Sequence, residues 1–336
     1  MHATQAAHAV LEVTGLSTVY PTSRGDVQAV RNVSFTIREG HLLAIVGESG
    51  CGKSATLLSI MRLVPRPGRI VGGSVLFAGQ NLMELNPGAM REVRGRDIAM
   101  VFQDPMTTLN PVFRVGEQIA ESLRVHGLLP RFPASLSRAS RARERELVTE
   151  LLRKVGIPSP ETRHLEYPHQ FSGGMQQRIL IAIALACKPK VLLADEPTTA
   201  LDVTVQAQVL ELVREINETA GTAVALVTHD LALAAEFCHE VAVMYAGQIV
   251  EQGPTEAVLE DPMHPYTRGL LRSIPRMGER KRLTPIMGEV PDLACLGPGC
   301  GFAPRCDLRR PCCDTFEPGP VSVDLHRTVR CHAYSD

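Results

Sequence analysis

The sequence predicts an α/β fold with a parallel sheet at its core and a smaller unit appended after it. Two observations carry this prediction. Short apolar runs such as LLAIVG, VLLADE and VALVTH alternate along the chain with stretches of helical periodicity, and continuous apolar runs are typical of strands buried on both faces. The chain has 336 residues, of which 44% are hydrophobic, so it is long enough for one large core and a second small unit.

The remaining elements follow from local patterns. VSFTIREG alternates apolar and polar residues, as a strand with one buried face does. The segment 241–253 (VAVMYAGQIVEQG) is typical of two short strands joined by a turn at Ala246–Gly247. Beyond it the pattern gives way to a proline-rich stretch. We therefore expect a main domain at 1–255 and a C-terminal extension at 256–336.

Composition and charge exclude several classes of protein. The longest apolar run, Ile179 to Cys187, is about half the length of a membrane-spanning helix, and the first residues lack the build of a signal peptide. We therefore expect a cytoplasmic protein. Its net charge is −1 and its pI is about 6.8, so no general positive field attracts nucleic acid, and no nucleic-acid partner is expected.

The stretch GESGCGKS follows the apolar run LLAIV and precedes the helical pattern ATLLSIMRL. It matches G-x-x-x-x-G-K-[ST] in a strand–loop–helix context, where backbone N–H groups and the helix N-terminus bind phosphates. Lys53 would reach the β- and γ-phosphates, and Ser54 would offer its hydroxyl to Mg²⁺. The predicted nucleotide-binding residues of this loop are Gly47, Glu48, Ser49, Gly50, Cys51, Gly52, Lys53 and Ser54.

Two carboxylates end the apolar run VLLADE. Burying them is costly without charged partners, and a bound Mg²⁺–nucleotide is such a partner. Asp195 would then hold Mg²⁺ through water, and Glu196 would polarise the attacking water as general base. The two residues alone also fit a helix N-cap after a strand, so this assignment depends on the phosphate loop.

A second loop leads into a helix at YPHQFSGGMQQR, where Ser172, Gly173 and Gly174 precede the helical pattern. The N-terminus of a helix that follows such a loop is another anion-binding site, here without a lysine. With both loops in place, the sequence resembles the nucleotide-binding subunit of an ABC transporter, whose signature motif is LSGGQ. Here the motif is FSGGM, so Phe171 and Met175 depart from it.

The resemblance covers nearly the whole chain. It implies a P-loop NTPase of ABC type with a RecA-like core, an antiparallel β subdomain, a helical subdomain inserted at about 104–178 and a small cysteine-rich C-terminal extension. It implies roles for four more residues: adenine stacking by Tyr20, the Q-loop glutamine Gln103 as a catalytic residue and Mg²⁺ ligand, the D-loop aspartate Asp202, and the catalytic switch histidine His229. Taken alone, Tyr20 also fits a turn-packing aromatic and His229 a core or capping histidine.

In that family two such domains face each other head to tail, so the SGG loop of one caps the γ-phosphate bound by the other. The stretches 103–119, 197–212 and 264–271 look like those of oligopeptide and dipeptide importer ATPases. The resemblance therefore implies ATP-driven peptide import, with a second ATPase in a heterodimer, two membrane permeases and an extracytoplasmic peptide-binding protein as partners. The chain would lie peripherally on the cytoplasmic face of the inner membrane. Import of nickel or another solute, and a soluble ATPase acting on nucleic acid or the ribosome, are the alternatives.

Six of the nine cysteines fall between Cys295 and Cys331. Disulfides are rare in cytoplasmic proteins, so we expect a metal site instead. The candidate ligands, spaced C-x5-C-x6-C-x17-C, are Cys300, Cys306, Cys313 and Cys331. This spacing fits neither zinc ribbons nor ferredoxins. The resemblance to peptide-importer ATPases implies a [4Fe–4S] cluster, with zinc or free buried thiols as alternatives, and Cys312 or Cys295 could replace a ligand.

Overall fold

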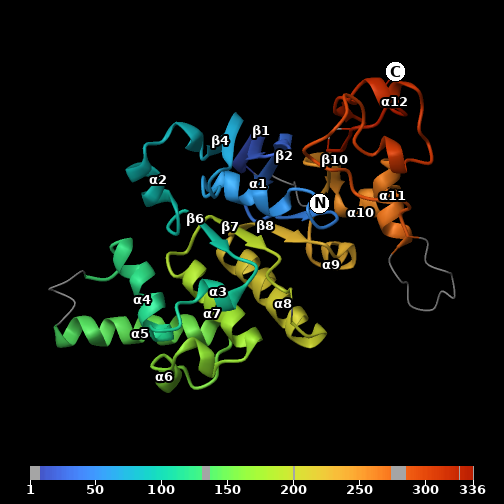
Figure 1. Cartoon of the computed structure of the whole chain (residues 1–336). Coiled ribbons are helices and arrows are strands. Elements are labelled where there is room, and N and C mark those ends of the chain that lie inside the picture. Colours follow the sequence, from blue (N-terminus) through green and yellow to red (C-terminus); the bar gives the residue numbers. More distant parts are fainter. Residues whose placement is uncertain (1–7, 131–136, 200, 274–284, 325, 336) are drawn as a thin grey trace. The chain divides into compact units, whose positions relative to one another are not determined.

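The computed structural model describes residues 8–130, 137–199, 201–273, 285–324 and 326–335 (Figure 1). Its contacts divide the chain into two units. We call Leu85–Val224 the helical unit, and His8–Glu84 together with Ala225–Asp336 the sheet unit. The expected extension 256–336 thus falls in one unit with the phosphate-loop stretch. The domain boundary expected near residue 255 stays a prediction.

The sheet unit contains most of the strands. They are β1 (Ala9–Thr22), β2 (Gly25–Arg38), β3 (Leu42–Val46), β4 (Arg69–Phe77), β5 (Gln80–Asn81), β8 (Ala223–Thr228, mostly in this unit), β9 (Glu240–Tyr245), β10 (Gln248–Pro254), β11 (Val321–Ser322) and β12 (Thr328–Val329). Its helices are α1 (Lys53–Ile60), α9 (Leu231–Phe237), α10 (Thr255–Glu260), α11 (Pro265–Arg272) and α12 (Cys312–Thr315), with the 3-10 turns η1 (Leu82–Glu84) and η4 (Ala303–Arg305).

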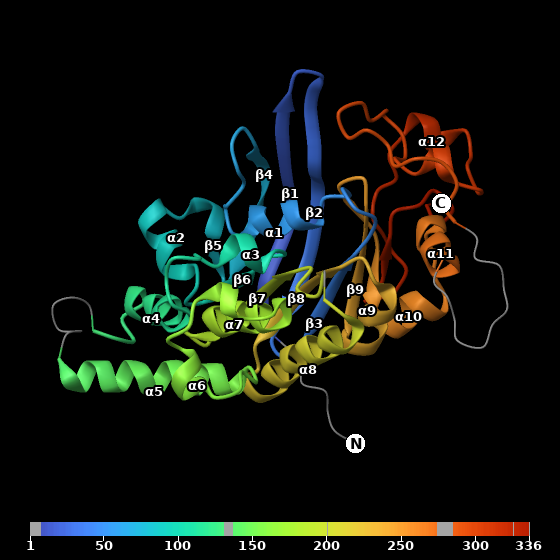
Figure 2. The same cartoon turned by 60° about the horizontal axis from the view of Figure 1, so that its bottom comes forward.

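These strands form two sheets. One is antiparallel in the order β2-β1-β4-β5, and the long β1 and β2 lie side by side in Figure 2. In the other sheet this unit supplies the order β11-β12-β10-β9-β3-β8. Every residue of β3 and β8 is buried, as expected for strands covered on both faces. The sequence prediction of buried strands is correct for these runs.

The strand pair predicted at 241–253 is present. β9 and β10 pair antiparallel around Ala246 and Gly247, which both have positive φ (46° and 82°). Two positive φ values fit a tight hairpin turn whose twist matches the strands. β12 then pairs with β10, so the end of the chain adds strands to the edge of this sheet.

The helical unit contains α2 (Pro87–Val93), β6 (Ile98–Val101), α3 (Pro105–Thr108), α4 (Val115–Val125), α5 (Arg138–Lys154), α6 (Pro160–Arg163), the 3-10 turn η3 (Pro168–Gln170), α7 (Gly173–Leu185), β7 (Val191–Asp195) and α8 (Val203–Ala220). β6 and β7 pair in parallel. The range 104–178, expected as a helical insertion, holds α3 to α6 and the start of α7. In the part of the chain that the structure describes, no helix is long and apolar enough to cross a membrane.

Candidate functional site

The phosphate-loop stretch lies between β3 and α1 in the sheet unit. Two of its glycines are required by close approach: a Cβ on Gly47 would lie 2.2 Å from the Met244 carbonyl oxygen, and one on Gly52 2.1 Å from that of Ala29. Gly52 is also the N-cap of α1, with a φ of 106° that favours glycine. Glycine is required at both positions because a Cβ would collide with these carbonyl oxygens.

Lys53 follows directly. It is 5% exposed, and its Nζ donates to the carbonyl oxygens of Gly47 (2.8 Å) and Glu48 (3.1 Å). The ammonium group therefore lies against the loop at the N-terminus of a helix. This arrangement concentrates positive potential where a phosphate would bind.

Three further predicted residues lie in the sheet unit. Tyr20 is half-buried on β1, and burial raises the pKa of its phenol. Cys51 is fully buried, and burial raises the pKa of its thiol to about 11, so the thiol is protonated and unreactive at neutral pH. His229 is exposed directly after β8.

The predicted catalytic carboxylate is in the helical unit. Asp195 ends β7 and is 5% exposed. Glu196 follows with a φ of 43°, a left-handed conformation that is strained for a non-glycine residue. Its Oε2 accepts hydrogen bonds from Gln103 Nε2 (3.3 Å) and Thr199 Oγ1 (2.8 Å). The structure thus brings Gln103 and Glu196 together, and Thr199 is a contact that the sequence analysis did not find.

The signature stretch is also in the helical unit. Ser172 is exposed and is the N-cap of α7, where its Oγ accepts from the backbone N–H of Met175 (3.4 Å). A Cβ on Gly174 would lie 2.3 Å from Cγ1 of Val205 in α8. Asp202 is the N-cap of α8, where its Oδ1 accepts from the N–H of Val205 (2.9 Å). The two helix starts therefore pack closely, and only glycine allows this approach.

The two departures from the LSGGQ motif contact the same arginine. The Arg163 guanidinium lies 5.4 Å from the centre of the buried Phe171 ring, and its Nη1 lies 3.2 Å from the sulfur of Met175. Cation–π contact of this kind stabilises both groups. Arg163 was not singled out from the sequence, because a surface arginine on a short helix has no distinctive pattern.

The expectation of an iron–sulfur cluster is wrong. Within residues 285–324 and 326–335, as in the other described ranges, no group of three or more His, Cys, Asp or Glu side chains could hold a metal. The cysteines do lie in one part of the extension, since the Cys313, Cys331 and Cys306 thiols each contribute to a raised pKa at Cys300. Burial is the main cause and raises that pKa to about 11.

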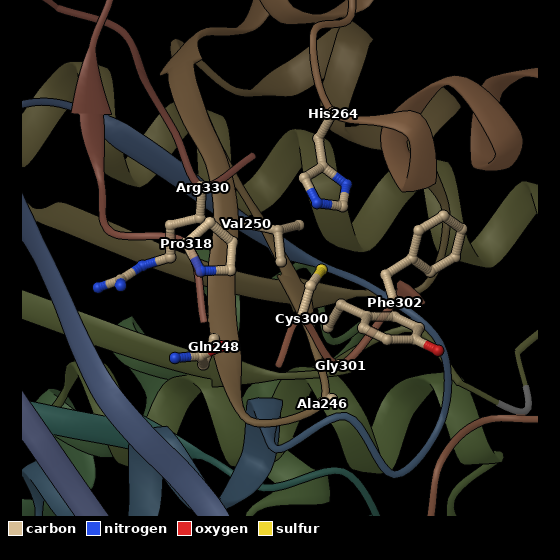
Figure 3. A pocket seen from close by; sticks show the side chains of 10 residues that line it. Ala246, Gln248, Val250, His264, Cys300, Gly301, Phe302, Pro318 and Arg330 are labelled. Carbon is tan, nitrogen blue, oxygen red and sulfur yellow. The ribbon is translucent and has the colours of Figure 1, made fainter. Parts of the chain in front are cut away.

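Figure 3 shows the surroundings of Cys300. Its side chain lines a small pocket together with His264, Phe302, Gln248 and Arg330, and no second cysteine is among the ten lining residues. The zinc alternative has no support either, because the described residues include no group of three or more His, Cys, Asp or Glu side chains that could hold a metal. The spacing of the cysteines therefore does not predict a metal site.

The oxygen donors predicted for Mg²⁺ are of the right chemical type. Asp195 and Gln103 in the helical unit and Ser54 in the sheet unit offer carboxylate, amide and hydroxyl oxygens, which Mg²⁺ prefers in proteins. A phosphate loop after a buried parallel strand, with a second buried strand ending in two carboxylates, defines the class: an ATPase of the P-loop type.

Comparison with known proteins identifies the family. The family model described as ABC transporter matches residues 30–199, and the one described as oligopeptide/dipeptide transporter, C-terminal region, matches residues 250–313. A dimeric bacterial ABC transporter cassette has a TM-score of 0.63 at 28% identity, covering 73% of this chain and 98% of that one. A post-hydrolysis state of a cassette with ADP and Pi bound gives a TM-score of 0.63 at 27% identity, with the same coverage.

Two sequence relatives extend over nearly the whole chain. A putative peptide import ATP-binding protein of Brucella ovis is 47% identical, covering 96% of both chains. The dipeptide transport ATP-binding protein DppD of Bacillus subtilis is 48% identical, covering 96% of this chain and 94% of that one. The chain belongs to the ABC transporter family, as its ATP-hydrolysing subunit with the C-terminal region of oligopeptide/dipeptide transporters. The resemblance stated from the motifs is confirmed.

Proposed function

We propose that this chain binds and hydrolyses ATP to power the import of dipeptides and oligopeptides. The observation that carries the peptide assignment is the match of nearly the whole chain, C-terminal region included, to ATP-binding proteins named for peptide import and dipeptide transport. These relatives favour peptide over nickel or another solute, and a transporter subunit over a soluble ATPase acting on nucleic acid or the ribosome.

The nucleotide roles expected from the motifs are supported by the geometry of the phosphate loop and of the carboxylates within each unit. Gly47 to Ser54 would wrap the phosphates, with Lys53 on the β- and γ-phosphates, and Tyr20 would stack on adenine. Ser54, Asp195 and Gln103 would hold Mg²⁺, which neutralises phosphate charge when bound. His229 would respond to the γ-phosphate as the switch residue.

Glu196 would accept the proton of the attacking water. The hydrogen bonds from Gln103 and Thr199 to its Oε2 hold the carboxylate in one orientation, as a general base that takes a proton from a positioned water requires. Because a general base must lie within hydrogen-bond reach of the proton it takes, this fixed orientation is what the reaction needs. The strained backbone at Glu196 is consistent with such a role.

The second anion site would act on another chain. Ser172, Gly173 and Gly174 at the exposed start of α7 would cap the γ-phosphate bound by the opposing ATPase, and Asp202 would lie at the same interface. We propose a heterodimer of two ATPases on the cytoplasmic face of the inner membrane, bound to two permeases and served by an extracytoplasmic peptide-binding protein. The cysteine-containing end of the chain would form a small extension of this ATPase.

Mixing two inactive variants tests the shared site. Lys53→Ala removes the phosphate contact within a chain, and Ser172→Arg blocks the cap on the opposing chain. In a homodimer of this chain, each variant alone should lose ATP hydrolysis, while their mixture should regain one competent site per dimer. With the natural second ATPase, each variant should inactivate a different site. Lys154→Ala, at an exposed lysine of α5, is the matched control and should hydrolyse normally. Normal turnover by both single variants would reject the arrangement.

A further inference from the structure

The phosphate loop carries a carboxylate that the C-terminal extension neutralises. Glu48 is the second residue of the loop, and Arg305 in η4 forms a bidentate ion pair with its carboxylate. Nη1 donates to Oε2 (2.7 Å), and Nη2 donates to Oε1 (3.0 Å). The Arg305 side chain is only 4% exposed, and that of Glu48 is 26% exposed. Bidentate pairs of this kind are among the strongest charge-assisted hydrogen bonds.

Arg305 is fixed by the extension and its surroundings. Its Nε donates to the carbonyl oxygen of Met287 (3.1 Å), and its Nη1 also donates to the hydroxyl of Tyr245 (3.3 Å). The guanidinium lies over the rings of Tyr245 and Phe302, at 5.8 Å and 6.0 Å from their centres. The hydrogen bonds to Glu48 raise the pKa of Arg305 above its usual value. The guanidinium is therefore a permanent, pre-oriented cation.

A second contact reaches the same loop residue through the backbone. The Tyr266 hydroxyl accepts a hydrogen bond from the Glu48 N–H (2.9 Å). Tyr266 is fully buried, and its ring packs against Tyr245 (4.5 Å between centres) and Phe302 (5.5 Å). Burial raises the pKa of its phenol, so the hydroxyl stays neutral. The sequence HPYTRGLL that begins α11 thus contributes directly to the loop.

The charge at Glu48 matters because the loop binds an anion. Lys53 Nζ lies 3.1 Å from the Glu48 carbonyl oxygen, so the carboxylate belongs to a residue that lines the expected phosphate site. A free carboxylate there would repel the phosphates, and this repulsion is strong where water is partly excluded. The Arg305–Glu48 ion pair as a whole carries no net charge, so its repulsion of the phosphates is weak.

We propose that Arg305 is a positioning residue for ATP binding, which acts through Glu48 by cancelling its charge and fixing the loop. The extension would thereby be part of the nucleotide site, and a partner that displaced Arg305 would lower the affinity for ATP. This inference rests on the proposed role of Gly47–Ser54 in phosphate binding.

A similar ion pair in the same unit provides a matched control. Arg31 pairs with Glu317, also joining the first part of the chain to the extension, and their side chains are 10% and 34% exposed. Arg31 donates to the Ala246 carbonyl oxygen, and among the described residues it makes no hydrogen bond or ion pair with the phosphate loop. Losing this pair should therefore affect stability and not nucleotide affinity.

The experiment measures the Kd for MgATP of the full chain by calorimetry. Arg305→Gln should weaken binding about tenfold, because the carboxylate is left unpaired. Glu48→Gln should bind at least as tightly as the wild type, since Arg305 then carries a free positive charge. The double variant should return to within about threefold of the wild type. Arg31→Gln should leave the Kd unchanged. The loss in Arg305→Gln should shrink at high salt.

Two outcomes would overturn the proposal. The first is wild-type affinity for MgATP in Arg305→Gln. The second is a double variant that binds MgATP as weakly as Arg305→Gln does, since removing the Glu48 charge would not rescue a loss caused by packing. If Arg305→Gln does not fold, weaker binding by Glu48→Gln overturns it equally. Lys53→Ala separates this failure from that of the proposed function. Normal ATP binding by Lys53→Ala would reject the site itself, whereas loss of binding there with unchanged Arg305→Gln rejects only the role of Arg305.

Discussion

His264 should make the folded protein sensitive to acid. The residue is 1% exposed, and burial lowers the pKa of its imidazole to about 3, with the Arg268 charge adding to the shift. Its Nδ1 accepts the N–H of Tyr266 (3.1 Å) and so caps α11. Protonation would place an uncompensated charge in the core and remove this cap. The Glu251 carboxylate lies nearby but accepts from the His264 backbone N–H.

Proton linkage gives the sign and the size of this loss of stability at low pH. In the unfolded chain His264 should titrate near 6.5, so the folded state binds fewer protons below that pH. Its contribution to stability is complete above pH 6.5 and is lost as the pH falls towards 3. Each pKa unit corresponds to about 1.4 kcal/mol. The wild type should therefore lose about 2 kcal/mol between pH 7.5 and 5 through this residue alone.

Urea unfolding of the wild type and His264→Asn at pH 7.5 and 5 measures this contribution. Asparagine is a good N-cap and keeps an oxygen for the Tyr266 N–H, but it does not titrate. The variant loses ring packing against Phe302 equally at both pH values. The other titrating groups are the same in both proteins, so their contributions cancel when the two losses of stability are compared. The wild type should lose about 2 kcal/mol more than the variant, and losses equal within about 0.5 kcal/mol would refute the reasoning.

Three further predictions concern single side chains. Glu196→Gln keeps an oxygen for Gln103 and Thr199, so ATP should still bind while turnover falls by about 10²- to 10⁴-fold; turnover within about threefold of wild type would contradict this. Gly174→Ala should reduce hydrolysis more than ATP binding, because its Cβ collides with Val205; an unchanged rate would contradict it. Arg327→Gln leaves the fully buried Glu251 unpaired and should cost about 3 kcal/mol in urea unfolding, and a loss below about 1 kcal/mol would count against it.

The elements nearest the nucleotide were predictable because local sequence determines them. A buried apolar strand, a glycine-rich turn and a helix start within about fifteen residues specify the phosphate loop, and Gly47 and Gly52 prove sterically required. The hairpin at Ala246 and Gly247 follows from the same kind of short-range pattern.

Contacts across long sequence separations were not predictable. Arg305 and Glu48 are 257 residues apart, and nothing in either local sequence indicates that they pair. For the cysteines, a local sequence pattern predicted a site that the described residues do not form. Their clustering in the sequence led to the expectation of a metal site, but the described side chains form no group of three or more that could hold a metal.

Peptide uptake by the assembled importer tests the central claim most directly. The measurement uses proteoliposomes that contain this chain, its second ATPase and both permeases, with the binding protein and a labelled dipeptide on the outer side and MgATP on the side of the ATPases. We expect dipeptide uptake that requires ATP and falls to background with Glu196→Gln in this chain. ATP-driven uptake of nickel but not of dipeptide, or dipeptide uptake that Glu196→Gln leaves unchanged, would contradict it.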